Sequence, residues 1–244
     1  MTAVARAPQA PERRASLRSD ARDVLGRLLV GTAAGALAGI LVGGLGGRIV
    51  MLVLRLTSDP VVIGVTSDDG FEIGRFTVGG TLQLLGATAA LGAANGALYV
   101  VLRGALPCRA RAPLWALFAA AAGGSQFVHS DGVDFVLLEP LSLAVVAFVS
   151  LPGLAALVVV LLVERWLRDD ARRPNTVTLG LAAATGTIAL PIAGALAAAV
   201  LLTRRLGLSP ALARAGRLLV PTLLLVGTVV AGWYTVAEAA QILG

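Results

Sequence analysis

Acidic side chains are concentrated in two short stretches between apolar blocks, and their types suit chemistry with cations. Carboxylate oxygens are the ligands that Ca²⁺ and Mg²⁺ prefer, and an imidazole can join them around a transition metal. Asp131 and Asp134 are close enough in sequence to share one ion. The pattern predicts a candidate external acidic site, with the identity of any metal left open. Its members are Asp68, Asp69, Glu72, His129, Asp131, Asp134 and Glu139.

A plainer interpretation is that these residues form solvated loops, capped turns and pairs with arginine. His129 is the only histidine, and we expect a polar loop residue there rather than a ligand or a catalytic base. Asp68 or Asp69 can join Asp131 and Asp134 only if the two stretches meet in space. The spacing does not show whether they do.

Other enzyme signatures do not hold up in this sequence. It has no nucleophile elbow, paired-histidine metal motif, phosphate-binding Walker loop or cysteine pair. Cys108 is the only cysteine, so an intramolecular disulfide cannot form. We therefore expect no cofactor.

Composition indicates which elements must position these residues. Hydrophobic residues make up 57% of the 244 residues and charged residues 14%, whereas soluble proteins carry about 25% charge. The apolar residues form long blocks, each close to the roughly 20 residues that cross a bilayer as a helix. This predicts an all-α polytopic membrane helix bundle of about six spans, with a disordered tail at 1–22 and one membrane domain at 23–244. The spans are expected near 28–47, 76–102, 112–130, 140–163, 174–203 and 218–237.

The third stretch, 112–130, is the weakest, because it is short and ends in polar residues, and a re-entrant segment is the alternative. The fifth, 174–203, has an alternative in which it turns back near Pro191.

Arginine placement predicts the orientation, because basic residues accumulate in cytoplasmic loops. All 20 basic residues are arginine, and 13 of them lie in the N-terminal region up to Arg27 and in the loops after the second and fourth spans. The N-terminus is therefore expected to be cytoplasmic and the acidic loops external, as in small multi-pass proteins of bacterial inner membranes. The loop at 204–217 departs from this pattern, since it carries four arginines on the predicted outer side. Arginines at the ends of apolar blocks suit lipid headgroups, so no nucleic-acid partner is expected.

Small residues recur every four positions on the first span and again on the second. Four residues is just over one helical turn, so each set forms a stripe that lets another backbone approach closely. We expect the two spans to pack through this glycine zipper. A sliding or pore-lining surface and a contact between copies of the chain are the alternatives. The stripes are Gly31, Gly35, Gly39, Gly43 and Gly47 on the first span, and Thr88, Gly92 and Gly96 on the second.

Several further polar residues lie within or beside the spans. Arg48 and Arg55, seven residues apart, share a helix face and are expected to reach lipid headgroups or to pair with the external acids. Asn95 is expected to hydrogen-bond across helices, and Glu238, after an aromatic pair, to reach headgroups.

A short internal similarity suggests two related hairpins. Residues 65–68 read VTSD and residues 128–131 read VHSD, each between two predicted spans. Chance and shared turn chemistry are the alternative explanation.

Three functions fit these observations. The first is a membrane scaffold or partner subunit, in contact with the lipid bilayer and with a membrane protein or further copies of the chain. The second is a small transporter or channel with an acidic external vestibule. The third is a membrane enzyme with carboxylate chemistry on its outer face. No activity or substrate follows from the sequence.

Overall fold

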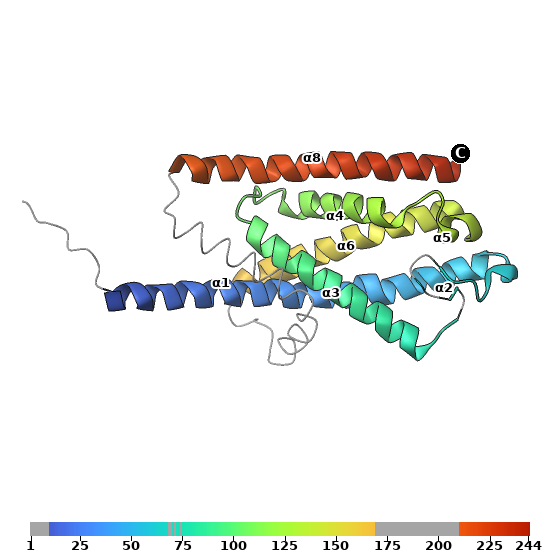
Figure 1. Cartoon of the computed structure of the whole chain (residues 1–244), viewed down its shortest axis with the longest axis horizontal. Coiled ribbons are helices and arrows are strands. Elements are labelled where there is room, and N and C mark those ends of the chain that lie inside the picture. The colour runs from blue at the N-terminus through green and yellow to red at the C-terminus, as the bar shows by residue number, and fades with distance from the viewer. Residues whose placement is uncertain (1–9, 68–69, 71, 74, 169–209) are drawn as a thin grey trace, which may run out of the picture.

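The computed structural model describes residues 10–67, 70, 72–73, 75–168 and 210–244. Within this part of the chain all regular secondary structure is helical, apart from one isolated antiparallel β-bridge between Thr66 and Glu72. The helices run roughly side by side in an elongated bundle (Figure 1). They are α1 (Ala10–Ala38), the π-helix η1 (Gly39–Gly46), α2 (Gly47–Thr57), the 3₁₀ turn η2 (Pro60–Val62), α3 (Val78–Leu102), α4 (Arg111–Phe127), α5 (Val133–Leu137), α6 (Leu141–Arg168) and α8 (Pro210–Leu243).

Four helices are long and apolar enough to cross a membrane: Arg22–Thr57, Val78–Leu102, Leu141–Arg168 and Leu218–Leu243. The fold is therefore all-helical with four candidate spans in the described part, and the expected total of six is not confirmed. The third predicted stretch forms α4, whose 17 residues reach about 25 Å, short of a hydrocarbon core of about 30 Å. The fifth predicted stretch, 174–203, lies outside the described residues.

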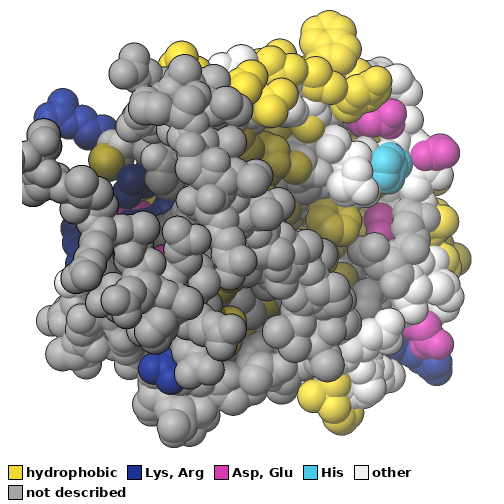
Figure 2. Space-filling model, turned by 60° about the vertical axis from the view of Figure 1, so that its left-hand side comes forward, with side chains coloured by type: hydrophobic (Ala, Val, Ile, Leu, Met, Phe, Trp, Pro, Cys, Tyr) yellow, Lys and Arg dark blue, Asp and Glu magenta, His cyan; other side chains and the backbone are white. Residues whose placement is uncertain are grey.

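Side-chain size is distributed as expected for helices that face lipid. Ala34, Ala93 and Ala97 are completely buried, whereas Leu82 and Leu91 are each 64% exposed. In water, burial of the largest aliphatic side chains would drive folding, but lipid gives no such drive, and small residues then pack best between helices. Hydrophobic side chains also line the upper edge of the molecule, where α8 lies (Figure 2). This pattern supports a membrane environment independently of hydropathy.

The crossing of α1 and α3 brings the two stripes of small residues into contact. A Cβ atom on Gly35 would collide with the carbonyl oxygen of Gly92, and one on Gly31 would lie 2.5 Å from the carbonyl oxygen of Gly96. Farther along, Gly39 lies against the backbone of Thr88. The two backbones therefore touch along this crossing, and any side chain there would separate them.

The end of the first stripe coincides with the π-helix η1. A π-helix closes i→i+5 hydrogen bonds, so the face that meets α3 recurs every five residues instead of every four. Gly39 and Gly44 are accordingly the buried residues of η1. Gly43 lies against the side chain of Thr88, where a Cβ atom added to the glycine would be 3.0 Å from the Cβ of the threonine. Gly47 is farther from α3, since a Cβ atom there would make only an ordinary 4.0 Å contact with Leu84.

Small residues also set the remaining layers. α6 packs against α1 and α3, α4 packs on α6, and α8 covers α4 (Figure 1). The ring of Pro152 in α6 lies against Gly123 of α4, and Gly153 lies against Ala120. The bundle is thus held by the same kind of close contact at several crossings.

The N-terminal segment differs from the expected tail. The sequence predicts disorder over residues 1–22, but the chain is helical from Ala10 onward; residues 1–9 lie outside the described part. α1, η1 and α2 follow one another without a break from Ala10 to Thr57, which is about 70 Å at roughly 1.5 Å per residue. In Figure 1 the start of α1 extends beyond the ends of the other helices.

The α1–α3 crossing predicts different outcomes for two glycines on α3. Gly92→Ala places a methyl group against the carbonyl of Gly35 and should lower the free energy of unfolding by about 1–3 kcal/mol, as overpacking does. Gly86 has open space around it among the described residues, so Gly86→Ala should change it by about 0.5 kcal/mol or less. Thermal unfolding of both variants in the same detergent measures the difference, and equal midpoints would contradict the crossing.

Candidate functional site

The bundle has two ends with polar side chains. We call the end that carries Thr57, Val78, Phe127 and Leu141 the outer end, following the predicted topology, and the opposite end the inner end.

At the outer end the two predicted external loops meet. The Oγ of Ser58, just after α2, accepts a hydrogen bond of 2.7 Å from the backbone N–H of Glu139, and the hydroxyl of Thr57 donates to the Glu139 carbonyl oxygen. The peptide bond between Glu139 and Pro140 is cis. Beneath these contacts Leu54 packs in one buried cluster with Val128 and Phe135. Segments more than 80 residues apart are thereby held side by side.

The predicted acidic residues lie in different surroundings in the structure. Asp134 is buried at the start of α5, with 7% exposure, whereas Asp131 is exposed. Glu72 forms an exposed ion pair of 2.9 Å with Arg75. Asp68 and Asp69 lie outside the described residues.

The remaining members use backbone contacts. The Nε2 of His129 lies 2.9 Å from the carbonyl oxygen of Gln126, and Glu139 contributes its backbone to the contacts with Thr57 and Ser58. No group of three His, Cys, Asp or Glu side chains in the described part of the chain is arranged to hold a metal ion.

Two of the acidic residues, one from each loop, converge on a cavity of about 50 Å³, which we call the outer pocket. Glu72 and Asp134 line it together with Arg48, Arg55 and Arg75. The rest of its wall is mostly apolar and includes Met51, Leu52, Ile73, Phe76, Leu138 and Phe148. The pocket therefore combines arginine, carboxylate and apolar groups at the outer end of the bundle.

The two arginines of α2 occupy different surroundings in this pocket. The guanidinium carbon of Arg48 lies 5.2 Å from the centroid of the Phe76 ring, a cation–π contact. Arg55, half-buried, makes no hydrogen bond or ion pair with any residue that the structure describes. The predicted shared face of Arg48 and Arg55 thus looks into the pocket.

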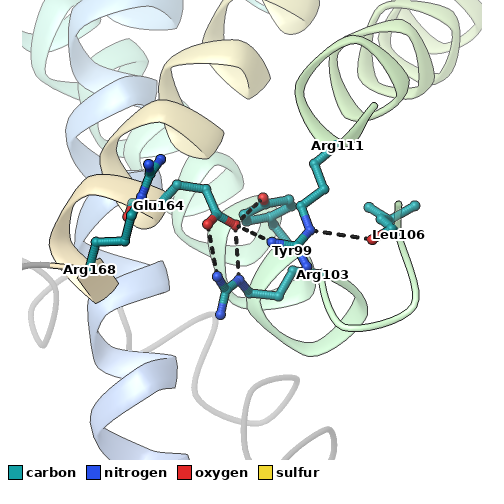
Figure 3. Close-up of polar contacts among 6 residues, drawn as sticks. All are labelled: Tyr99, Arg103, Leu106, Arg111, Glu164 and Arg168. Atoms are coloured by element: carbon teal, nitrogen blue, oxygen red, sulfur yellow. Dashed lines mark hydrogen bonds and ion pairs between the residues drawn. The ribbon is translucent and has the colours of Figure 1, made fainter. Parts of the chain in front are cut away.

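At the inner end a single carboxylate gathers four donors (Figure 3). Arg103 binds Glu164 through two parallel hydrogen bonds, Nε to Oε1 at 3.0 Å and Nη2 to Oε2 at 2.9 Å. Tyr99 donates its hydroxyl to Oε1 at 2.8 Å, and Arg111 donates Nη1 to the same oxygen at 3.2 Å. These residues come from α3, α4, α6 and the α3–α4 loop, so the carboxylate ties three helices together. We call this set, Tyr99, Arg103, Arg111 and Glu164, the Glu164 cluster.

Aromatic packing supports the Glu164 cluster. The rings of Tyr99 and Trp115 lie 5.5 Å apart, and both side chains are completely buried. The indole N–H of Trp115 donates to the amide oxygen of Asn95 at 3.0 Å, so Asn95 does hydrogen-bond across helices as predicted. Water has little access here, because the Glu164 side chain is only 15% exposed. Hydrogen bonds to a charged carboxylate are strong in such surroundings.

The charge balance of the Glu164 cluster is well defined. Burial disfavours the charge on Arg103, but the hydrogen bonds to Glu164 outweigh it and raise the pKa of Arg103 above its ordinary value. Two guanidinium groups thus face one carboxylate whose oxygens are already engaged. Such an arrangement holds the three helices in place.

Glu238 differs from its expected role at lipid headgroups. Its Oε2 accepts a 2.7 Å hydrogen bond from the backbone N–H of Ser130, and the hydroxyl of Ser130 donates to Gln241 at 3.0 Å. Glu238 therefore fastens α8 to the loop that follows α4.

Sequence reasoning missed Glu164 as a site residue. A signal was present, because Glu164 is the first charged residue after a long apolar stretch and the loops after the second and fourth predicted spans fall on one side. An acid at one span end and arginines at the other can then meet. No protein-family model matches the chain, and neither a curated protein nor a solved structure is significantly similar to it.

Replacement of glutamate by alanine should destabilise the protein far more at Glu164 than at Glu72. Glu164→Ala leaves Arg103 and Arg111 partly buried without their carboxylate, and should lower the free energy of unfolding by about 3–5 kcal/mol. Glu72→Ala removes an exposed pair with Arg75 and should cost about 1 kcal/mol or less. Thermal unfolding in detergent compares them, and a Glu164→Ala midpoint as high as that of Glu72→Ala would show that the Glu164 cluster does not hold the helices.

Proposed function

We propose that the protein is a membrane scaffold or partner subunit that presents a helical extension to another protein on the cytoplasmic side. The observation that carries this proposal is the length of the helix from Ala10 to Thr57. Its length of about 70 Å exceeds the roughly 40–45 Å of a whole bilayer. Because the helix ends at Thr57, where the outer loops meet, the surplus lies at the N-terminal end.

The base of this extension is firmly anchored. Val24 and Leu28 of α1 are buried with Ala97 of α3, next to Val100 and Val101. The helix continues on the N-terminal side of Val24 as residues 10–23, which we call the inner extension. Its position is set by the α1–α3 crossing, so it is carried at a defined place relative to the membrane domain.

The sequence of the inner extension suits a protein partner. It contains charges of both signs, with four arginines and three acidic residues. Asp20, Arg22 and Asp23 are exposed. A helix that continues the direction of a membrane span also leads away from the lipid surface, and salt screens charges beyond roughly 8–10 Å. A mixed-charge surface held there favours a protein contact over binding to anionic lipid.

The transporter alternative would use the outer pocket as its vestibule. A transporter must also alternate between arrangements of its helices. The backbone contacts between α1 and α3 and the Glu164 cluster instead favour a bundle with one arrangement. For this reason the scaffold is our first proposal.

The sidedness of the proposal is testable with Cys108, which is exposed in the α3–α4 loop. A membrane-impermeant maleimide should label Cys108 only after the cells are permeabilised, because the inner end faces the cytoplasm in this topology. A Cys108→Ser, Glu72→Cys variant is the matched control and should be labelled in intact cells. The reverse pattern would place the outer pocket in the cytoplasm.

Site-specific photocrosslinking tests the partner. A photoreactive amino acid at Asp20 should give one discrete cross-linked protein band in intact cells. The same amino acid at Leu223, which is 66% exposed on α8, should give lipid adducts only. If Asp20 gives no discrete band while the protein is present in the membrane, and purified protein conducts ions in proteoliposomes, the transporter alternative replaces the scaffold.

A further inference from the structure

We infer that the outer pocket binds a phosphate-type anion, held by Arg55 and Arg48 and carried by the headgroup of a lipid or free in solution. This inference does not rest on the scaffold proposal, because it concerns the opposite end of the bundle. It rests on the charges that line the cavity, on its size and on its apolar wall.

The charged residues that line the outer pocket, within the described part of the chain, include one more cation than anions. Among the described lining residues there are three arginines and two carboxylates. Arg75 is already paired with Glu72 at 2.9 Å. Arg48 and Asp134 line the pocket as well and have interactions of their own. Arg55 is the remaining charged residue of the described lining.

Arg55 is the group that an anion would satisfy. It is half-buried against the cavity, and it has no hydrogen bond or ion pair in the described part of the chain. A guanidinium presents a fork of donors that matches a phosphate oxygen pair. Arg48 contributes a second positive charge seven residues earlier on the same helix, held over the ring of Phe76.

The size of the cavity suits a small anionic group. A volume of about 50 Å³ corresponds to room for roughly three to five water molecules. This is enough for a phosphate group but not for a large organic molecule. A larger ligand would have to leave most of its body outside the pocket.

The apolar wall suggests how such a body would be placed. Met51 and Leu52 lie on α2 between the two arginines, and Phe148 faces them from α6. The distance between Arg48 and Arg55 along α2 is about 10 Å, so the pocket extends from the helix end into the apolar part of the bundle. A lipid could therefore place its phosphate at the arginines and its chains along the outside of the helices.

Binding of two probes to the purified full chain tests this inference and separates the two sources. The first probe is fluorescent phosphatidylglycerol in detergent micelles, and the second is inorganic phosphate added as a competitor. We expect phosphatidylglycerol to bind at one site per chain, and Arg55→Gln to raise its Kd about tenfold, the loss expected for one charge-assisted contact. Arg109→Gln, in the inner α3–α4 loop, is the matched control and should leave the Kd unchanged.

The outcomes are distinct. Displacement of the probe by millimolar inorganic phosphate identifies a soluble anion as sufficient, whereas failure to displace it identifies the lipid as the source. Met51→Trp, which fills the cavity without removing a charge, should weaken binding as well and guards against misfolding of Arg55→Gln. If neither variant changes the Kd while both proteins keep the wild-type thermal unfolding midpoint, the inference is wrong.

Discussion

The contact on which the rest of the structure depends is the meeting of two backbones at Gly35 and Gly92. In a membrane, apolar side chains gain little by leaving lipid for protein, so helices associate through close packing and hydrogen bonds. Because glycine has no side chain, α1 and α3 approach until the carbonyl groups of one helix touch the backbone of the other. That approach fixes where α1 lies along α3, and with it the height of the inner extension at one end and of Arg48 and Arg55 at the other. The same device recurs between α4 and α6, where Gly123 receives the ring of Pro152.

Polar groups complete what close packing begins, and they do so at the helix ends. The Glu164 cluster ties α3, α4 and α6 at the inner end, while Ser58 and Glu139 tie the two loops at the outer end. Most of the buried hydrophobic residues in the described part of the chain are alanine or valine. An ion pair at mid-membrane would be costly to desolvate, whereas near the boundary the cost falls and the attraction remains considerable. The bundle therefore has an apolar middle, which suits the lipid core, and polar ends, which suit the boundary with water.

Much of the helical layout was predictable, because the period and length of apolar blocks are local properties. Gly31, Gly35 and Gly39 of the first predicted stripe lie against the second stripe at the α1–α3 crossing, whereas Gly47 lies farther from α3. The convergence of Glu72 and Asp134 was not predictable, since it depends on how two distant loops are fastened by Ser58. The position of Glu164 at the end of an apolar stretch marks it in the sequence, but its partners Arg103 and Arg111 come from another part of the chain, and spacing along the sequence does not show that they meet. The helical start at Ala10 was missed because arginine and proline there resembled a solvated tail.

The π-helix between Gly39 and Gly46 has a consequence for the arginines that follow it. A π-helical turn accommodates about one residue more than an α-helical turn does, and each residue of an α-helix rotates the chain by about 100°. Deletion of one residue in this segment with a return to α-helical winding would therefore leave the direction of α2 nearly unchanged. A return to α-helical winding with every residue kept would instead turn α2 by more than roughly a quarter of a circle relative to α1. Arg48 and Arg55 would then point away from Glu72 and Asp134, although none of these residues had changed. The direction in which the outer arginines point is therefore set by the π-helical winding of the segment between them and the glycine crossing.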